Sequence, residues 1–215
     1  MKISSQAGNR SNKAFTLIEM IGVLAVIAIL AAVLIPKVFQ AINDARVNNA
    51  AMTVGAVKTA IADHYAKAGS LVVIVTNNVT ATLGLPMEQF DKVLVAEQFM
   101  DKPFQTKIGD NILGAGNTRV RAFDISTAGF TNNAAVDGTI ATGFALGNTN
   151  SVNDMVGATG IEAVITGVTA GDAKDLNDRL DGPSLGSAIN LDDFKGRVKY
   201  IAGSPTIVYI YLTHR

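Results

Sequence analysis

The stretch Phe15-Thr-Leu-Ile-Glu19-Met-Ile-Gly22-Val-Leu-Ala-Val-Ile-Ala-Ile-Leu-Ala-Ala-Val-Leu-Ile-Pro36 decides how this chain is organised. It is apolar almost throughout, and Glu19 is its one charged residue. A helix of these residues, rising about 1.5 Å per residue, reaches across the roughly 30 Å hydrocarbon core of a bilayer. The sequence therefore predicts a membrane-spanning helix over residues 15–36.

A short polar leader precedes this span. Residues 1–14 carry three basic residues, Lys2, Arg10 and Lys13, and no acid. Basic residues beside a membrane span stay on the cytoplasmic side. We therefore expect the rest of the chain to lie on the other side of the membrane.

After the span, the pattern changes to that of an amphipathic helix over residues 37–69. Gly69 is a good C-terminal stop for this helix. Apolar residues recur at steps of three and four, which places them on one face of a helix. These residues are Val47, Ala50, Val54, Val57, Ile61, Tyr65 and Ala68. The apolar face of this helix lies beyond the membrane span and therefore needs a partner to cover it. A β-sheet is the simplest one.

The basic leader, apolar span, early acid and amphipathic continuation together resemble type IV pilins and the pseudopilins of type II secretion. The resemblance covers about residues 13–69, and Lys13-Ala14-Phe15-Thr16-Leu17-Ile18-Glu19 is its most specific part. It implies that a prepilin peptidase cuts between Ala14 and Phe15 and that the new N-terminus at Phe15 is methylated. The family most often has Gly where this chain has Ala14.

The acid in the span also has an implied role in assembly. A charge at the bilayer centre costs about 2.5–3.5 kcal/mol on insertion scales. The free amine of Phe15 in a neighbouring subunit would neutralise Glu19, and the resemblance implies that Thr16 hydrogen-bonds the amine or the carboxylate. The alternative is that Glu19 reaches the headgroups alone. Gly22 and Pro36 are expected weak points of the helix, and Pro36 is expected to bend it because proline lacks an amide hydrogen.

Residues 70–215 are expected to form a globular head. Strands are predicted at 122–126, 161–168, 197–202 and 206–212, and short helices at 87–100 and 169–183. Residues 71–76 are either a strand or an apolar loop. The last strand is apolar on both faces, which indicates a covered central strand. An antiparallel sheet packed on the amphipathic helix gives an α+β, pilin-like fold. Residues 127–160, rich in Gly, Asn and Thr, are expected to form a surface loop.

The charge balance and the few residues that could act in catalysis or bind a metal limit the possible functions. Removal of residues 1–14 leaves 15 basic against 18 acidic side chains, which gives no basic footprint for nucleic acid. The chain has no cysteine, and its histidines are His64 and His214. We expect His64 at the surface or at a helix end. The acids of 172–181 lack the spacing of a calcium loop. We therefore expect no enzyme activity, metal or cofactor.

Three functions remain open at this stage. The first is a type IV pilus subunit, serving adhesion, motility or DNA uptake. It would be inserted in the inner membrane as a precursor and polymerised with other copies into a surface or periplasmic filament. Its implied partners are the prepilin peptidase, an assembly platform and a motor ATPase. The second is a pseudopilin of type II secretion, although 201 residues after the leader is long for the major form. The third is a single-pass anchored binding protein.

The charged residues after the span have two possible roles. They form either a solvated face or ion pairs between subunits; these residues are Lys37, Asp44 and Arg46.

Overall fold

A computed structural model describes the greater part of the chain. The described residues are 15–71, 74–75, 79–80, 89–110, 112–113, 117–124, 159–184, 189, 191, 193, 196–201, 203 and 206–214. The chain divides into two compact units, the first ending at Ile42 and the second beginning at Asn43. We call them the N-terminal unit and the head unit, and each is described by itself.

The longest element is helix α1, Leu17–Ala68. It contains Pro36 without a break in the helical assignment. It ends at Gly69, whose φ of +74° is left-handed and whose amide donates to the Tyr65 carbonyl at 2.8 Å. Glycine suits this position because it has no Cβ to clash there. The predicted C-terminal stop of the helix is therefore confirmed.

The part of α1 in the head unit buries one face. The predicted stripe is confirmed from Val47 to Ile61, whereas Tyr65 is half-buried and Ala68 is exposed. The buried face also includes Ala60 and His64. We expected His64 at the surface or at a helix end: only 6% of it is exposed, so the surface position was wrong, whereas it does lie near the C-terminal end of α1. The buried residues of α1 are Val47, Ala50, Val54, Val57, Ala60, Ile61 and His64.

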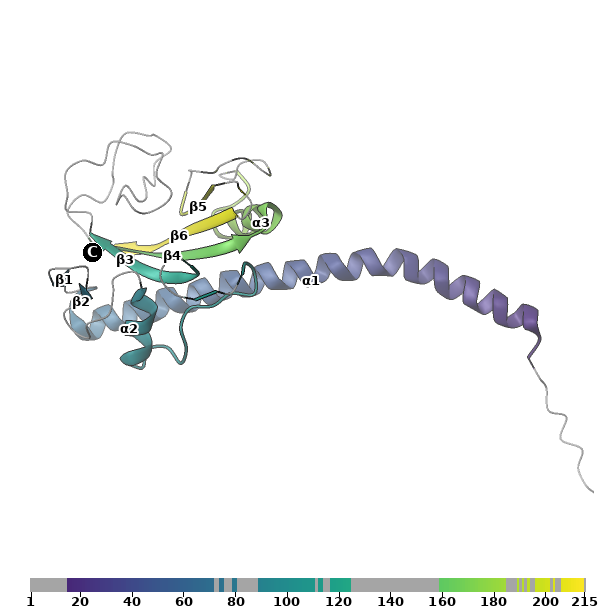
Figure 1. Cartoon of the computed structure of the whole chain (residues 1–215), viewed down its shortest axis with the longest axis horizontal. Coiled ribbons are helices and arrows are strands. Elements are labelled where there is room, and N and C mark those ends of the chain that lie inside the picture. Colours follow the sequence, from purple (N-terminus) through teal and green to yellow (C-terminus); the bar gives the residue numbers. More distant parts are fainter. Residues whose placement is uncertain are drawn as a thin grey trace, which may run out of the picture. The chain divides into compact units, whose positions relative to one another are not determined.

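The main sheet of the head unit has four antiparallel strands in the order β3-β4-β6-β5. A second pair, β1 and β2, is also antiparallel. Short helix α2 follows β2, and helix α3 connects β4 to β5 in the chain (Figure 1). The bounds are β1 Ile74–Val75, β2 Val79–Thr80, α2 Phe90–Ala96, β3 Arg119–Asp124, β4 Thr159–Val168, α3 Ala170–Leu180, β5 Val198–Ile201 and β6 Thr206–His214. The predicted α+β class is confirmed.

Two strand predictions need comment. Strand β6 lies between β4 and β5, so the predicted central position of the last strand is confirmed. Strand β3 begins at Arg119, three residues before the predicted start. The two arginines of β3 interrupt the apolar pattern, which is why the sequence hid this start. Most of the expected loop at 127–160 lies outside the described residues, and its last two residues belong to β4.

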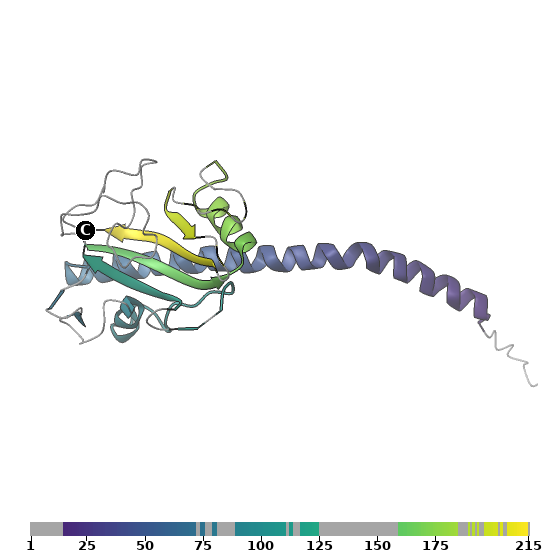
Figure 2. The same ribbon diagram turned by 45° about the horizontal axis from the view of Figure 1, so that its top comes forward.

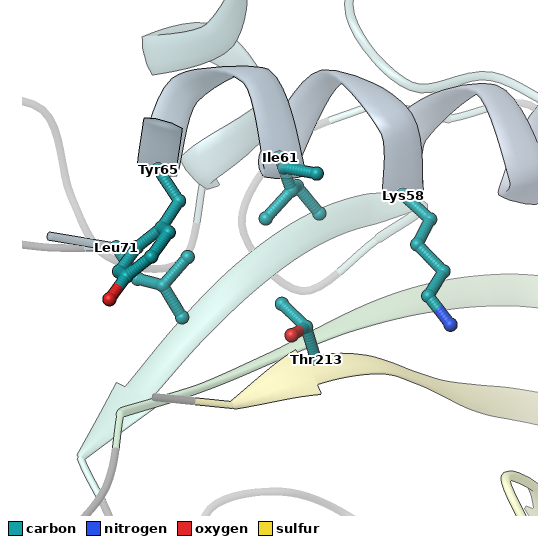
Figure 3. A pocket seen from close by; sticks show the side chains of 6 residues that line it. Lys58, Ile61, Tyr65, Leu71 and Thr213 are labelled. Atoms are coloured by element: carbon teal, nitrogen blue, oxygen red, sulfur yellow. The ribbon is translucent and has the colours of Figure 1, made fainter. Parts of the chain in front are cut away.

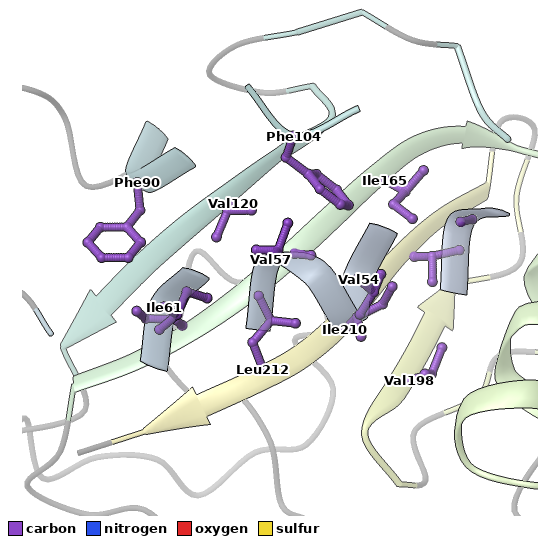
Figure 4. Close-up of a cluster of buried hydrophobic side chains, with 14 of the residues drawn as sticks. Val54, Val57, Ile61, Phe90, Phe104, Val120, Ile165, Val198, Ile210 and Leu212 are labelled. Atoms are coloured by element: carbon purple, nitrogen blue, oxygen red, sulfur yellow. The ribbon is translucent and has the colours of Figure 1, made fainter. Parts of the chain in front are cut away.

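The hydrophobic core joins α1 to the sheet. Val54, Val57 and Ile61 of α1 lie over strand residues such as Val120 and Ile210 (Figure 4). These residues are at most 5% exposed. All residues of this core cluster lie between Val47 and Leu212, so the head unit contains its own core. The predicted packing of the amphipathic helix against the sheet is confirmed.

Helix α3 is fixed at both ends by polar side chains. At its start, Thr169 caps the helix, because its hydroxyl accepts from the Asp172 amide at 3.1 Å. At its end, Asp181 accepts from the amides of Arg197 and Val198 at 2.5 and 2.8 Å. Its side chain is 2% exposed. Asp181 therefore attaches the entry to β5, in a chain without disulfides, to the end of α3.

We expect Asp181→Ala to destabilise the head unit by about 2 kcal/mol, because two backbone amides and the Arg197 guanidinium lose their acceptor. The measurement is urea unfolding of the mature chain in detergent micelles, followed by near-ultraviolet circular dichroism of its four tyrosines. Asp175→Ala, on the exposed face of α3, is the control and should change the unfolding free energy by less than about 0.5 kcal/mol. Equal midpoints for the two variants would contradict this role of Asp181.

Candidate processing and assembly site

The first turn of α1 brings together Thr16 and Glu19. One carboxylate oxygen of Glu19, Oε2, accepts from the Thr16 amide at 2.8 Å and from the Thr16 hydroxyl at 2.7 Å. The Glu19 amide in turn donates to the Thr16 hydroxyl oxygen at 3.3 Å. Thr16 is thus the N-cap and Glu19 the third helical residue. This reciprocal arrangement is a capping box.

The capping box changes how the acid in the span is understood. Sequence reasoning sought the neutralisation of Glu19 in the headgroups or in a neighbouring subunit, and a hydrogen bond from Thr16 to the amine or the carboxylate was given only as what the resemblance implies. The structure shows that Glu19 is partly satisfied by its own helix end, since amides at a helix N-terminus carry partial positive charge. The sequence signal for this capping box is Thr16 followed three residues later by Glu19, directly before an apolar run. Within the described chain, the other oxygen, Oε1, accepts no hydrogen bond, so it stays open to a further donor.

Between Met20 and Ile35, α1 is apolar on every side of the helix. The large hydrophobic side chains of the N-terminal unit, from Phe15 to Ile42, are between 43% and 80% exposed. The most apolar window has a mean hydropathy of 2.9, and none of it is buried. A helix that is apolar all round requires lipid or other apolar helices to cover it. The unit is therefore long and apolar enough to cross a membrane.

The remaining predicted residues of this site are placed as follows. Phe15 is 80% exposed, immediately before the N-cap. Ala14, on the other side of the expected cut, lies outside the described residues. Gly22 and Pro36 both lie inside α1, and apart from the helix backbone around it, Gly22 has open space in the described chain where a side chain would begin. The predicted weak points at Gly22 and Pro36 stay predictions.

A second polar site lies where α1 ends. His64 Nδ1 is 2.5 Å from Glu97 Oε2, and His64 Nε2 is 3.1 Å from the Leu71 carbonyl oxygen. The ring also makes edge contacts with Phe90 and Phe99. Both ring nitrogens therefore have an oxygen partner, one from the end of α2 and one from the chain after α1. His64 connects three segments of the head unit and serves packing.

A third polar cluster lies under α3. The Asn177 amide donates to the Asp193 carboxylate, and Asp193 exchanges two backbone hydrogen bonds with Tyr200 at 2.8 and 2.9 Å. Burial, and after it the Asp193 and Asp178 carboxylates, raises the pKa of the Tyr200 phenol to about 12. The cluster attaches the loop after α3 to β5. Sequence reasoning missed it because Asn177 occupies a buried position of α3.

Small hollows also exist in the head unit. One, of about 120 Å³, lies between α1 and the end of β6 (Figure 3). It is lined by Lys58, Ile61, Ala62, Tyr65, Leu71 and Thr213. This lining holds no carboxylate, histidine or cysteine to act as a base or nucleophile. Among the described residues, no group of three or more His, Cys, Asp or Glu side chains is arranged to hold a metal ion.

These features define a chain with an apolar, capped N-terminal helix and a separate α+β head. Comparison with protein families adds the specific signal. Residues 9–35 match the model of the prokaryotic N-terminal methylation motif. Comparisons with curated proteins and with solved structures gave no significant match.

The matched residues contain the predicted cut between Ala14 and Phe15, the capping box and nearly the whole apolar span. The chain therefore carries the prepilin-type signal of type IV pilins and pseudopilins. This signal and the exposed apolar helix fit a precursor anchored in the membrane.

Proposed function

We propose that this protein is a structural subunit of a type IV pilus. A prepilin peptidase removes residues 1–14, Phe15 becomes the methylated N-terminus, and copies polymerise with their apolar helices inside the filament. An assembly platform and a motor ATPase drive extraction of each copy from the inner membrane. The subunit itself acts as a building element and not as an enzyme.

The observation that carries this proposal is the state of the N-terminal unit. Its large apolar side chains have no partner in the described chain. Sister helices offer an apolar environment equivalent to lipid, and the hydrophobic effect would retain them there once they leave the bilayer. The methylation motif at the same residues supports cleavage immediately before this helix.

The capping box supports a specific role for Glu19. Oε2 is used by Thr16 of the same chain, while Oε1 has no donor in the described residues. Cleavage before Phe15 creates an amine that can bind this oxygen in a neighbouring subunit. An uncleaved chain has no such amine, so assembly would follow processing. A pseudopilin of type II secretion shares these features and is the second candidate.

We expect the mature protein to begin at a methylated Phe15 and to be the major component of sheared surface fibres. The measurement is intact mass spectrometry of the N-terminus together with electron microscopy and peptide mapping of the fibres. Ala14→Gly should cleave at least as completely, because it restores the residue most frequent in the family. A purified protein that begins at Met1 would contradict the proposal. Loss of enzyme secretion without any fibre, on deletion of the gene, would instead favour the pseudopilin.

A further inference from the structure

We propose that a polar hollow on one flank of the head unit binds the outer edge of α3 in a second copy of this chain. The inference rests on the proposed filament and adds which head surfaces meet in it. It combines three observations. The lysines of the hollow form no ion pair in the described chain, two carboxylates of the helix edge form none there either, and the two surfaces lie on different flanks of α1.

The basic surface is a hollow of about 320 Å³ beside α1. It is lined by Asn49, Thr53, Lys102, Gln105, Thr106 and Lys107. The lining has two ammonium groups and two side-chain amides, together with two threonine hydroxyls that already donate to backbone carbonyls, and it contains no carboxylate. Lys102 and Lys107 are exposed, and neither forms an ion pair with the described chain. Such a surface fits an acidic partner.

The acidic surface is the outer edge of α3. Three of the charges on this helix have partners already: Lys174 pairs with Asp178 at 2.5 Å, and Arg179 pairs with Asp44 of α1 at 3.0 Å. Asp172 and Asp175, one turn apart, have no ion pair within the part of the chain that the structure describes. Asp175 is exposed and Asp172 is half-buried. This edge therefore offers two carboxylates to a basic partner.

Both surfaces lie at the same level of α1. Helix α3 contacts α1 through Arg179, which donates to Asp44 and Asn48. The hollow includes Asn49 and Thr53 of the same helix. Because an α-helix turns about 100° per residue, the two pairs of α1 residues are about 140° apart around its axis. The two surfaces thus lie on different flanks of one short section of α1.

The figures agree with this placement. Helices α3 and α2 lie on opposite sides of α1 in both views, and the chain that supplies Lys102 and Lys107 follows α2 (Figures 1 and 2). The basic hollow and the acidic edge therefore do not meet within one subunit. Two subunits side by side can join them.

A contact of this kind has a consequence for assembly. It joins two different surfaces, so an open array keeps one free hollow at one end and one free α3 edge at the other. Such head-to-tail contacts form closed rings or open helical filaments. Exposed ion pairs are individually weak. Their part here is to set the register between neighbouring heads, while the apolar helices hold the polymer together.

The test uses the absence of cysteine from the natural chain. Lys107→Cys and Asp175→Cys are introduced together, and intact fibres are treated with a short bis-maleimide cross-linker. We expect most subunits to appear as dimers and longer oligomers on denaturing gels. The control chain carries Lys92→Cys with Asp175→Cys, because Lys92 is exposed on α2 but does not line the hollow. It should stay monomeric.

Fibres of the first variant that stay monomeric, or that link no better than the control, would overturn the proposal. A charge exchange gives a second readout in case the cysteine chain forms no fibres. Lys107→Glu and Asp175→Lys should each lower fibre yield about tenfold, and the two together should restore it. Unchanged yield in both single variants would also overturn it. If the proposed function is wrong, the unmodified chain forms no fibres. This result is therefore distinguishable from fibres that form without the proposed contact between heads.

Discussion

Glu19→Gln should abolish most fibre formation while the precursor is still inserted and cleaved. Glutamine can take the third position of a capping box, so the start of α1 is retained. What is lost is the negative charge that we propose to pair with the amine of a neighbouring Phe15. Breaking a buried charge pair by removing one partner costs about 3–5 kcal/mol. A loss of this size corresponds to a drop of about 100-fold or more in assembly.

The measurement is the mass of sheared fibre per cell, with the N-terminus of the membrane-held subunit checked by mass spectrometry. Asp63→Asn is the matched control, because Asp63 is an exposed acid on the same helix and should leave the yield unchanged. Glu19→Asp keeps the charge on a shorter side chain and should assemble better than the glutamine variant. If Glu19→Gln gives normal fibres, the neutralisation between subunits is wrong, and Glu19 serves only as a cap.

His64→Ala should be the most destabilising of the single changes considered in the head unit, by about 3–4 kcal/mol. The substitution removes the partner of Glu97 and of the Leu71 carbonyl. It also leaves a cavity beside Phe90 and Phe99, against which the ring packs edge-on. Both the unpaired polar groups and the cavity are costly in a buried site.

Urea unfolding of the mature chain in micelles measures this effect. His64→Gln, which retains one hydrogen-bonding group and most of the volume, should lose about half as much stability. Asp63→Ala, at the neighbouring exposed position, should lose less than about 0.5 kcal/mol. A His64→Ala chain as stable as the Asp63→Ala chain would show that the ring does not hold these segments together.

The elements that sequence reasoning predicted well have strong local signals. Helix α1 follows from the apolar run and the spacing from Val47 to Ile61, and Gly69 marks its end. Helix α3 follows from its Thr169 cap. Strand β6 follows from apolar residues on both faces, which only a covered central strand explains. In each case, one period or one terminal residue determines the element.

Other features depend on contacts far apart in the chain, and these the sequence does not show. The burial of His64 requires Glu97 and the Leu71 carbonyl to close around it. The early start of β3 places Arg121 opposite Glu162, and this buried pair hides the strand pattern. The capping box at Thr16 is a different case. Its signal is local, but Glu19 was considered mainly through the free-energy cost of placing a charged acid in the membrane.

The central place of β6 also sets the order in which the head can mature. Strands β4 and β5 each pair with one edge of β6, which is the last of the named strands. Until β6 is in place, the edge of β4 that it covers stays unpaired, and β5 has no neighbour in the main sheet. Closure of the main sheet therefore depends on the strand that comes last among the named elements.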